Sequence, residues 1–165
     1  MSASASGVDT VKADQRPWLL AGGLFVLCAT VAKLLIHLYA NRYYGYFTDE
    51  LYYLACARHL AWGYVDQPPL IALIAKLEMA LWGDSLSAIR FLPALAGAAK
   101  VLLTSLIARE LGGARFAQGL AALSVLLAPG FLGIDNLLSM NAFEPLFWMG
   151  SAYLVILIVR SGRQK

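Results

Sequence analysis

Acidic side chains that could accept a proton are concentrated in one polar, aromatic segment that follows an apolar stretch. Asp49 and Glu50 form an adjacent pair, and Asp66 lies just before the proline pair Pro68 and Pro69. A carboxylate close to lipid is costly, so it needs a partner, a cavity or a task. One such task is general base catalysis, in which the carboxylate takes a proton from a hydroxyl or amine nucleophile. Asp49 and Glu50 are therefore candidate catalytic residues.

A structural interpretation of the same pair stays open. Acidic residues in the first turn of a helix complement the helix dipole, and spacing alone favours this simpler account of Asp49 and Glu50. If the reaction releases an anionic group such as a phosphate, catalysis would also need cations that balance its charge. The candidates on the same side of the membrane are Arg58, His59, Lys76 and Arg90. Each of these cations alone is more often a headgroup or structural contact.

The composition indicates a membrane protein. The chain has 165 residues, of which 60% are hydrophobic and 14% charged, and its mean hydropathy is +0.66. In soluble domains roughly a quarter of the residues are charged, so this chain has too little polar surface to cover a globule in water. The 13 Lys and Arg residues are spread along the chain. Their spread predicts no nucleic-acid partner.

The hydrophobic pattern predicts an all-α integral membrane protein with four transmembrane helices. The expected spans are about 17–39, 86–108, 116–133 and 142–159. Residues 1–16 are polar and expected to be disordered, and 161–165 form a short tail. The loop 40–85 between the first two spans is expected to hold two juxtamembrane helices. One follows Thr48 as its cap, from Asp49 to about Trp62. The other, Leu70 to Trp82, is too short to cross and is interfacial or re-entrant.

Basic residues set the expected orientation. Short loops rich in Lys and Arg stay cytoplasmic, and with four crossings all three basic clusters fall on one side: Lys12 and Arg16, Arg109 and Arg115, and Arg160, Arg163 and Lys165. Both termini are therefore expected in the cytoplasm. The loop 40–85 and Asp135 are expected outside, and Lys33 and His37 are expected to reach the outer interface from the first span.

Three segments resemble a known family. They are 46–53 (YFTDELYY), 63–70 (GYVDQPPL) and 87–97 (SAIRFLPALAG). The first two look like the first outer loop of the GT-C glycosyltransferases, and the third looks like their second span. The closest resemblance is to the protein mannosyltransferase and aminoarabinose transferase superfamily, called glycosyltransferase family 39 with its bacterial relatives. The resemblance covers roughly residues 40–160.

This resemblance implies a function and a set of roles. It implies transfer of a sugar from a polyprenyl-phosphate donor to a protein, lipid or glycan acceptor on the extracytoplasmic side, in a membrane that we expect to be the bacterial inner membrane. Asp49 is the implied base and Glu50 its companion. Asp66 is the implied ligand of a divalent metal ion. Because relatives have around a dozen spans, the chain is interpreted as the N-terminal part of such an enzyme. The alternative is a non-catalytic membrane scaffold, or a remnant of a larger transferase or transporter.

Overall fold

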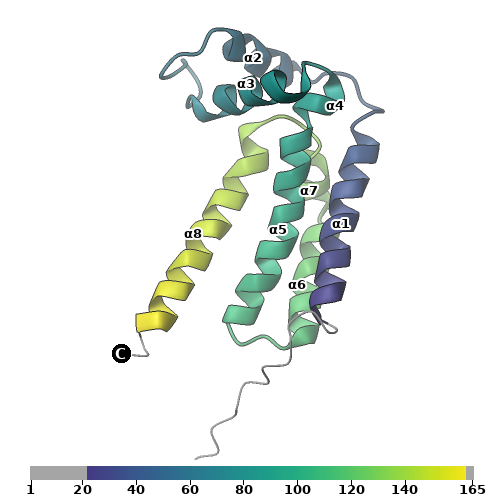
Figure 1. The fold of residues 1–165 in the computed structure, drawn as a ribbon, viewed down its shortest axis with the longest axis vertical. Helices are drawn as coiled ribbons and strands as arrows, with labels where there is room; N and C mark the ends of the chain where they lie inside the picture. The colour runs from purple at the N-terminus through teal and green to yellow at the C-terminus, as the bar shows by residue number, and fades with distance from the viewer. Residues whose placement is uncertain (1–21, 163–165) are drawn as a thin grey trace, which may run out of the picture.

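The computed structural model describes residues 22–162, and these residues are all-α, with no strand among them. The parts of the chain outside this range include the expected disordered segment 1–16 and the start of the first expected span. Figure 1 shows an upright bundle of helices beneath a layer of shorter helices. The elements are α1 (Gly22–Ala40), α2 (Thr48–Arg58), α3 (Leu70–Trp82), α4 (Leu86–Ile89), α5 (Phe91–Glu110), α6 (Arg115–Leu127), α7 (Pro129–Ile134) and α8 (Met140–Gly162).

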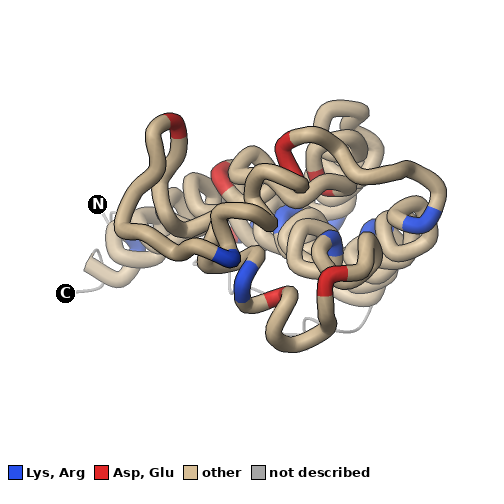
Figure 2. The backbone as a smooth tube through the Cα atoms, turned by 90° about the horizontal axis from the view of Figure 1, so that it is seen from above, with Lys and Arg blue, Asp and Glu red and all other residues tan. Residues whose placement is uncertain are grey.

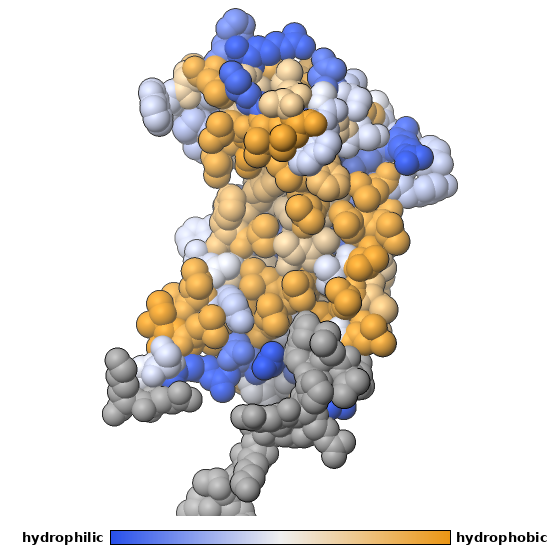
Figure 3. Space-filling model, viewed as in Figure 1, coloured by the Kyte–Doolittle hydropathy of each residue, from blue (hydrophilic) through white to orange (hydrophobic). Residues whose placement is uncertain are grey.

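The bundle has the dimensions and surface of a membrane domain. Three helical stretches, Gly23–Ala40, Leu86–Glu110 and Met140–Gly162, are long and apolar enough to cross a bilayer, and Arg115–Leu127 is a shorter apolar helix. Large apolar side chains such as Leu35 and Ile158 are exposed on their outer faces. Figure 3 shows this apolar surface between hydrophilic residues at both ends. The chain is an all-α integral membrane protein with about four spans.

The helix expected over 116–133 is interrupted. The structure divides it into α6 and α7, with Ala128 in an extended conformation (φ −61°, ψ 117°) between them. Proline disfavours the helical conformation of the residue before it, which explains a break immediately before Pro129. The prediction of one continuous helix there is wrong, and the chain instead turns into α7 beneath the upper layer.

The upper layer, which we call the loop layer, consists of residues 41–85 and contains α2 and α3 (Figure 1). Helix α3 spans the residues expected for the second juxtamembrane helix. Helix α2 starts one residue earlier than expected, so Thr48 is inside the helix and Phe47 is the cap. The helix also ends at Arg58 and not near Trp62. At this end of the helix, the Tyr64 hydroxyl donates a hydrogen bond to the Cys56 carbonyl oxygen at 3.0 Å.

Apolar side chains join the loop layer to the bundle. A cluster at this junction combines residues of α2, α3, α4 and α5 with residues around the start of α8: Tyr53, Leu54, Ala57, Ile71, Ala75, Ile89, Ala96, Leu138, Ala142 and Phe143. Helix α5 is the centre of the bundle and packs against α1, α6 and α8. Its buried face carries small residues, including Ala94, Gly97 and Ala98. Small residues let neighbouring helices approach closely in a membrane.

Candidate functional site

The two adjacent acids Asp49 and Glu50 have opposite environments. Asp49 is exposed in the first turn of α2, whereas Glu50 is fully buried. Successive residues of a helix point in directions about 100° apart, so one residue of the pair can face the protein while the other faces outward. The structure therefore gives the two acids different roles: Glu50 anchors α2, and Asp49 presents its carboxylate on the surface of the loop layer.

Glu50 is held by four hydrogen bonds from three parts of the chain. The Arg90 Nε–H donates to Oε1 and the Arg90 Nη2–H donates to Oε2, each at 2.7 Å. Backbone N–H groups donate as well, that of Phe47 to Oε2 at 2.9 Å and that of Leu138 to Oε1 at 3.0 Å. This side chain therefore links the start of α2 to the junction of α4 with α5 and to the segment that precedes α8.

Arg90 was a candidate phosphate ligand, but its guanidinium is fully occupied inside the protein. Besides the two bonds to Glu50, it donates from Nη1 to the carbonyl oxygens of Asn41 and Tyr44, at 3.4 and 3.2 Å, and from Nη2 to that of Gly45 at 2.9 Å. A guanidinium has five N–H donors, and all five are used here. Arg90 thus holds the start of the loop layer, and it has no donor left for a substrate phosphate in this structure.

Asp66 and Asp49 both lie close to the tyrosine pair of α2, Tyr52 and Tyr53. The Tyr52 hydroxyl donates a hydrogen bond to Asp66 Oδ1 at 2.7 Å, and this bond raises the pKa of Tyr52. Burial raises the pKa of the Tyr53 phenol, and the negative charges of Asp49 and then Asp66 raise it further. Both carboxylates therefore act on one aromatic pair, Tyr52 and Tyr53. The structure brings together two of the acids that the sequence predicted as site residues.

The remaining candidate cations, Arg58, His59 and Lys76, are all exposed in the loop layer. Arg58 lies 3.9 Å from the Asp84 carboxylate, with both side chains largely in solvent. Seen from above, acidic and basic positions are scattered over the molecule and neither kind is confined to one side (Figure 2). Within residues 22–162, no three His, Cys, Asp or Glu side chains gather to hold a metal ion. Asp66 accepts from Tyr52 and is not part of a complete ligand set, so metal binding there stays a prediction.

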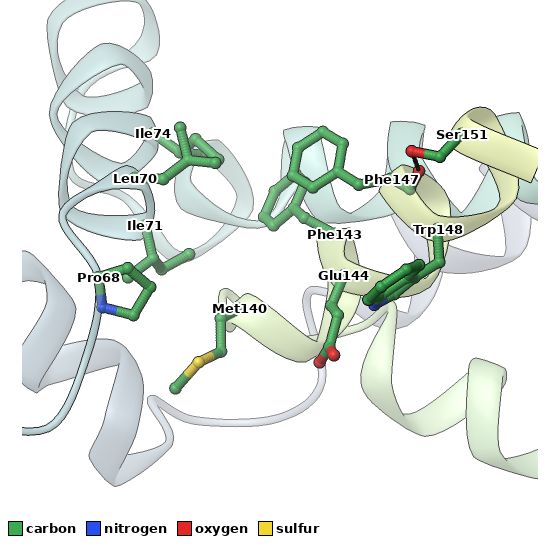
Figure 4. Close-up of a pocket in the computed structure, with 10 residues that line it drawn as sticks. All are labelled: Pro68, Leu70, Ile71, Ile74, Met140, Phe143, Glu144, Phe147, Trp148 and Ser151. Atoms are coloured by element: carbon green, nitrogen blue, oxygen red, sulfur yellow. Dashed lines mark hydrogen bonds between the residues drawn. The ribbon is translucent and has the colours of Figure 1, made fainter. Parts of the chain in front are cut away.

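A cavity of about 500 Å³ lies between α3 and α8, and we call it the α3/α8 cavity. Its walls are mostly apolar, with Pro68, Leu70, Ile71 and Ile74 on one side and Met140, Phe143, Phe147 and Trp148 on the other (Figure 4). Its α8 residues recur every three to four positions, so they form one stripe that runs down the helix from the loop layer. Glu144 is the charged residue of this lining.

Sequence reasoning missed Glu78 as a structural acid. Its side chain is fully buried in α3 and accepts a hydrogen bond from the Leu92 backbone N–H at 2.8 Å. Burial raises the pKa of Glu78 to about 8, partly opposed by that hydrogen bond and reinforced by the charge of Glu50. Two residues of an α-helix that are two positions apart point in directions about 200° apart, so Glu78 lies on the face of α3 opposite the exposed Lys76; this spacing is the signal in the sequence that could have found it.

Three further charges lie inside the bundle, and we call them the buried charge cluster: Lys33, Lys100 and Asp135. All three are fully buried. Lys33 Nζ lies 3.2 Å from Asp135 Oδ2, and Lys100 donates a hydrogen bond to Asp135 Oδ1. The expectation that Lys33 and His37 reach the outer interface is wrong, because the bundle encloses both. Asp135 likewise lies inside the protein and not in an exposed loop.

The apolar bundle and the amphipathic loop layer at one end of it define an integral membrane protein. The candidate site lies in this loop layer, where the exposed Asp49 follows the start of α2 next to the buried Glu50. Residues 66–165 match the family described as dolichyl-phosphate-mannose-protein mannosyltransferase. This match covers more than half of the chain, and the chain belongs to that family of glycosyltransferases. Asp49 and Glu50 precede the matched residues. No curated protein and no solved structure matches the chain significantly.

Proposed function

We propose that the chain takes part in sugar transfer from a polyprenyl-phosphate donor, with the Asp49 carboxylate as general base on the extracytoplasmic face. Family membership supports glycosyl transfer as the reaction class. The observation that supports this role is that Asp49 is exposed while the adjacent residue, Glu50, is buried and held by hydrogen bonds. Glu50, with four hydrogen bonds, holds the first turn of α2 in place, so the Asp49 carboxylate has a defined position on the loop layer.

In the proposed step, Asp49 takes the proton from an acceptor hydroxyl or amine as its oxygen or nitrogen bonds to the anomeric carbon of the sugar. The bond between that carbon and the phosphate oxygen breaks, and the phosphate leaves with the electron pair on the polyprenyl carrier. Arg58, His59 and Lys76 are exposed in the same layer and supply positive charge for the leaving phosphate. Arg90 acts differently, as a positioning residue through Glu50.

The α3/α8 cavity is the proposed place for the donor's lipid. Its walls are apolar, and its stripe of α8 residues continues from the loop layer towards the membrane-spanning part of the helix. A polyprenyl chain needs an apolar surface that begins where the phosphate meets the loop layer. Glu144, the carboxylate in this lining, is the proposed partner of sugar hydroxyl groups.

The test uses membranes from cells that express the complete gene, supplied with labelled polyprenyl-phosphate sugars. Asp49→Asn should lower transfer by about 100-fold or more, because a general base contributes that much to a rate. Protein abundance should stay unchanged, since Asp49 is exposed. Asp84→Asn is the matched control: it makes the same chemical change at an exposed acid of the same layer, and transfer should be retained.

The outcomes separate the proposal from its alternative. Normal transfer by the Asp49→Asn protein would remove the catalytic assignment of this residue. A wild-type protein that transfers no sugar from any of the labelled donors would favour the alternative of a non-catalytic membrane scaffold or remnant. In that case the acids of the loop layer would serve only to anchor and orient its helices.

A further inference from the structure

The outer side of α3 carries an exposed apolar stripe. Helix α3 lies across the end of the bundle and not along it (Figure 1). Four of its leucines are between 46% and 58% exposed: Leu70, Leu73, Leu77 and Leu81. Successive residues of an α-helix are about 100° apart, so these four lie within about 80° of one another around α3. We call them the leucine stripe.

The hairpin between α2 and α3 exposes two further apolar side chains. Trp62 is 98% exposed, and Val65 is completely exposed. The Tyr64 hydroxyl donates a hydrogen bond to the Cys56 carbonyl oxygen at 3.0 Å and accepts one from the Ala61 N–H at 3.2 Å. These bonds hold the hairpin against the last turn of α2. The exposure of Trp62 and Val65 is therefore a property of the folded loop layer.

An apolar hollow joins the hairpin to the leucine stripe, and we call it the hairpin hollow. It has a volume of about 430 Å³ and is lined by three residues of the hairpin and three from the start of α3: Leu60, Ala61, Trp62, Pro69, Leu70 and Leu73. Leu70 also lines the α3/α8 cavity, so one apolar surface continues from the hairpin past α3 to α8. In the view of Figure 3, apolar side chains cover the part of the loop layer next to the apolar surface of the bundle, and hydrophilic side chains cover its top.

The position of this surface favours lipid as its partner. A contiguous exposed apolar surface marks a contact with protein or membrane. This one is continuous with α8, which is long and apolar enough to cross a bilayer. Trp62 is of the type that favours the headgroup level. Lys76 is exposed and lies about 60° from Leu73 around α3. A lysine at such a border lays its stem along apolar surface and extends its ammonium group towards lipid phosphates.

We propose that the leucine stripe and the hairpin form a membrane anchor, which inserts into the leaflet next to the loop layer. Trp62, Val65 and the stripe contact acyl chains, one of which fills the hairpin hollow, and Lys76 lies at the level of the lipid phosphates. The anchor holds the loop layer at the headgroup level without a further membrane crossing. It is independent of the role of Asp49, so the anchor and the proposed transfer reaction stand or fall separately.

The first test measures whether this surface faces lipid or water, with the full chain in phospholipid nanodiscs that hold one copy each. Val65→Cys and Leu73→Cys are made in a background in which Cys28 is replaced by Ser and Cys56 by Ala, and each carries a fluorescent label. Ala55→Cys is the matched control, because Ala55 is exposed on α2. Lipids with a doxyl group on the acyl chain should quench the labels at 65 and 73 severalfold more than the control label. Iodide in the water should quench them in the reverse order.

Two outcomes of this test overturn the proposal. If iodide reaches the labels at 65 and 73 as readily as the control label, the surface lies in water. If neither quencher reaches them, protein and not lipid covers the surface. Strong quenching by the doxyl lipids with weak quenching by iodide assigns the surface to the bilayer.

The second test needs no label. The chain has four tryptophans, so subtracting the emission spectrum of a Trp62→Phe protein from that of the wild type isolates the emission of Trp62. Phospholipids with brominated acyl chains should quench this difference spectrum severalfold, because the indole lies among them. A difference spectrum with the emission maximum of tryptophan in water, unaffected by brominated lipid, would exclude insertion of Trp62. Size-exclusion profiles check that the variant folds.

Discussion

At the scale of single residues, the anchoring of the loop layer depends on the ion pair of Glu50 and Arg90. Both side chains are completely buried and mutually hydrogen-bonded. Removing one member of a buried pair leaves a charge without compensation, whereas replacing both members can be nearly neutral. The pair is thus a sensitive point of the fold, and its proposed effect on sugar transfer is exerted through the position of Asp49.

We expect Arg90→Met to lower the free energy of unfolding by about 3–5 kcal/mol, because it leaves the Glu50 carboxylate buried and unpaired. The double variant Glu50→Gln with Arg90→Met should lose less than the sum of the two single variants, since neither charge then remains. Thermal unfolding in detergent measures each value. Additive losses would show that the two side chains do not act as a pair.

Glu78 leads to a prediction about pH. Its pKa is raised from 4.5 to about 8 in the folded protein, so between these values the folded state keeps a proton that the unfolded state has lost. Stability from this group should therefore fall as the pH rises from about 4.5 to about 8. Glu78→Gln should flatten this dependence in thermal unfolding measurements, because the amide stays neutral. An equally steep decline in the variant would contradict the assignment to Glu78.

At the scale of elements, α5 is the helix on which the membrane bundle depends. It packs against α1, α6 and α8, and it carries Lys100 and Gly97 near the buried Asp135. A Cβ atom at Gly97 would lie 2.7 Å from Asp135 Oδ2. The absence of a side chain at Gly97 therefore makes room for the carboxylate that joins two lysines from different helices.

Gly97→Ala should accordingly destabilise the bundle by about 1–3 kcal/mol, the usual cost of overpacking a tight interior. Gly150→Ala is the matched control, because it changes a glycine of α8 at which a Cβ would meet nothing within 4 Å. Alanine is the better helix former, so this control should be neutral or slightly stabilising. Comparison of the two thermal unfolding curves tests the prediction, and an equal effect of both substitutions would contradict it.

At the scale of the whole molecule, polarity is distributed along the bundle axis in three zones. An apolar belt separates the loop layer from a hydrophilic far end (Figure 3). Basic residues lie there at the ends of α5 and α8 and at the start of α6: Arg109, Arg160 and Arg115. At that far end, Arg160 forms an ion pair with Glu110 at 2.6 Å and joins the end of α8 to the end of α5. If the basic end faces the cytoplasm, Asp49 lies on the extracytoplasmic face, as the proposed reaction requires.

Cysteine labelling tests this orientation in a background in which Cys28 is replaced by Ser and Cys56 by Ala. Gly45→Cys, in the loop layer, should react with an impermeant maleimide on intact cells, and Ala114→Cys should react only after permeabilisation. Ala114 is preferable to Gly113, where a Cβ would lie 2.7 Å from the Ala108 carbonyl oxygen. The reverse pattern would place the loop layer in the cytoplasm and remove the proposed site of transfer.

The sequence alone determined the membrane class, the approximate helices and the acidic pair, because these depend on local composition and on spacing of a few residues. Tertiary structure decided which of Asp49 and Glu50 is buried. It also paired Glu50 with Arg90, 40 residues away, and Lys100 with Asp135, 35 residues away. Such partners meet only when helices pack. The position of Lys33 and His37 near the end of the first span therefore predicted that they reach the interface, whereas the bundle encloses both. The local pattern of the sequence predicts in which helix a charged residue lies. Its ion-pair partner depends on how the helices pack, which only the tertiary structure shows.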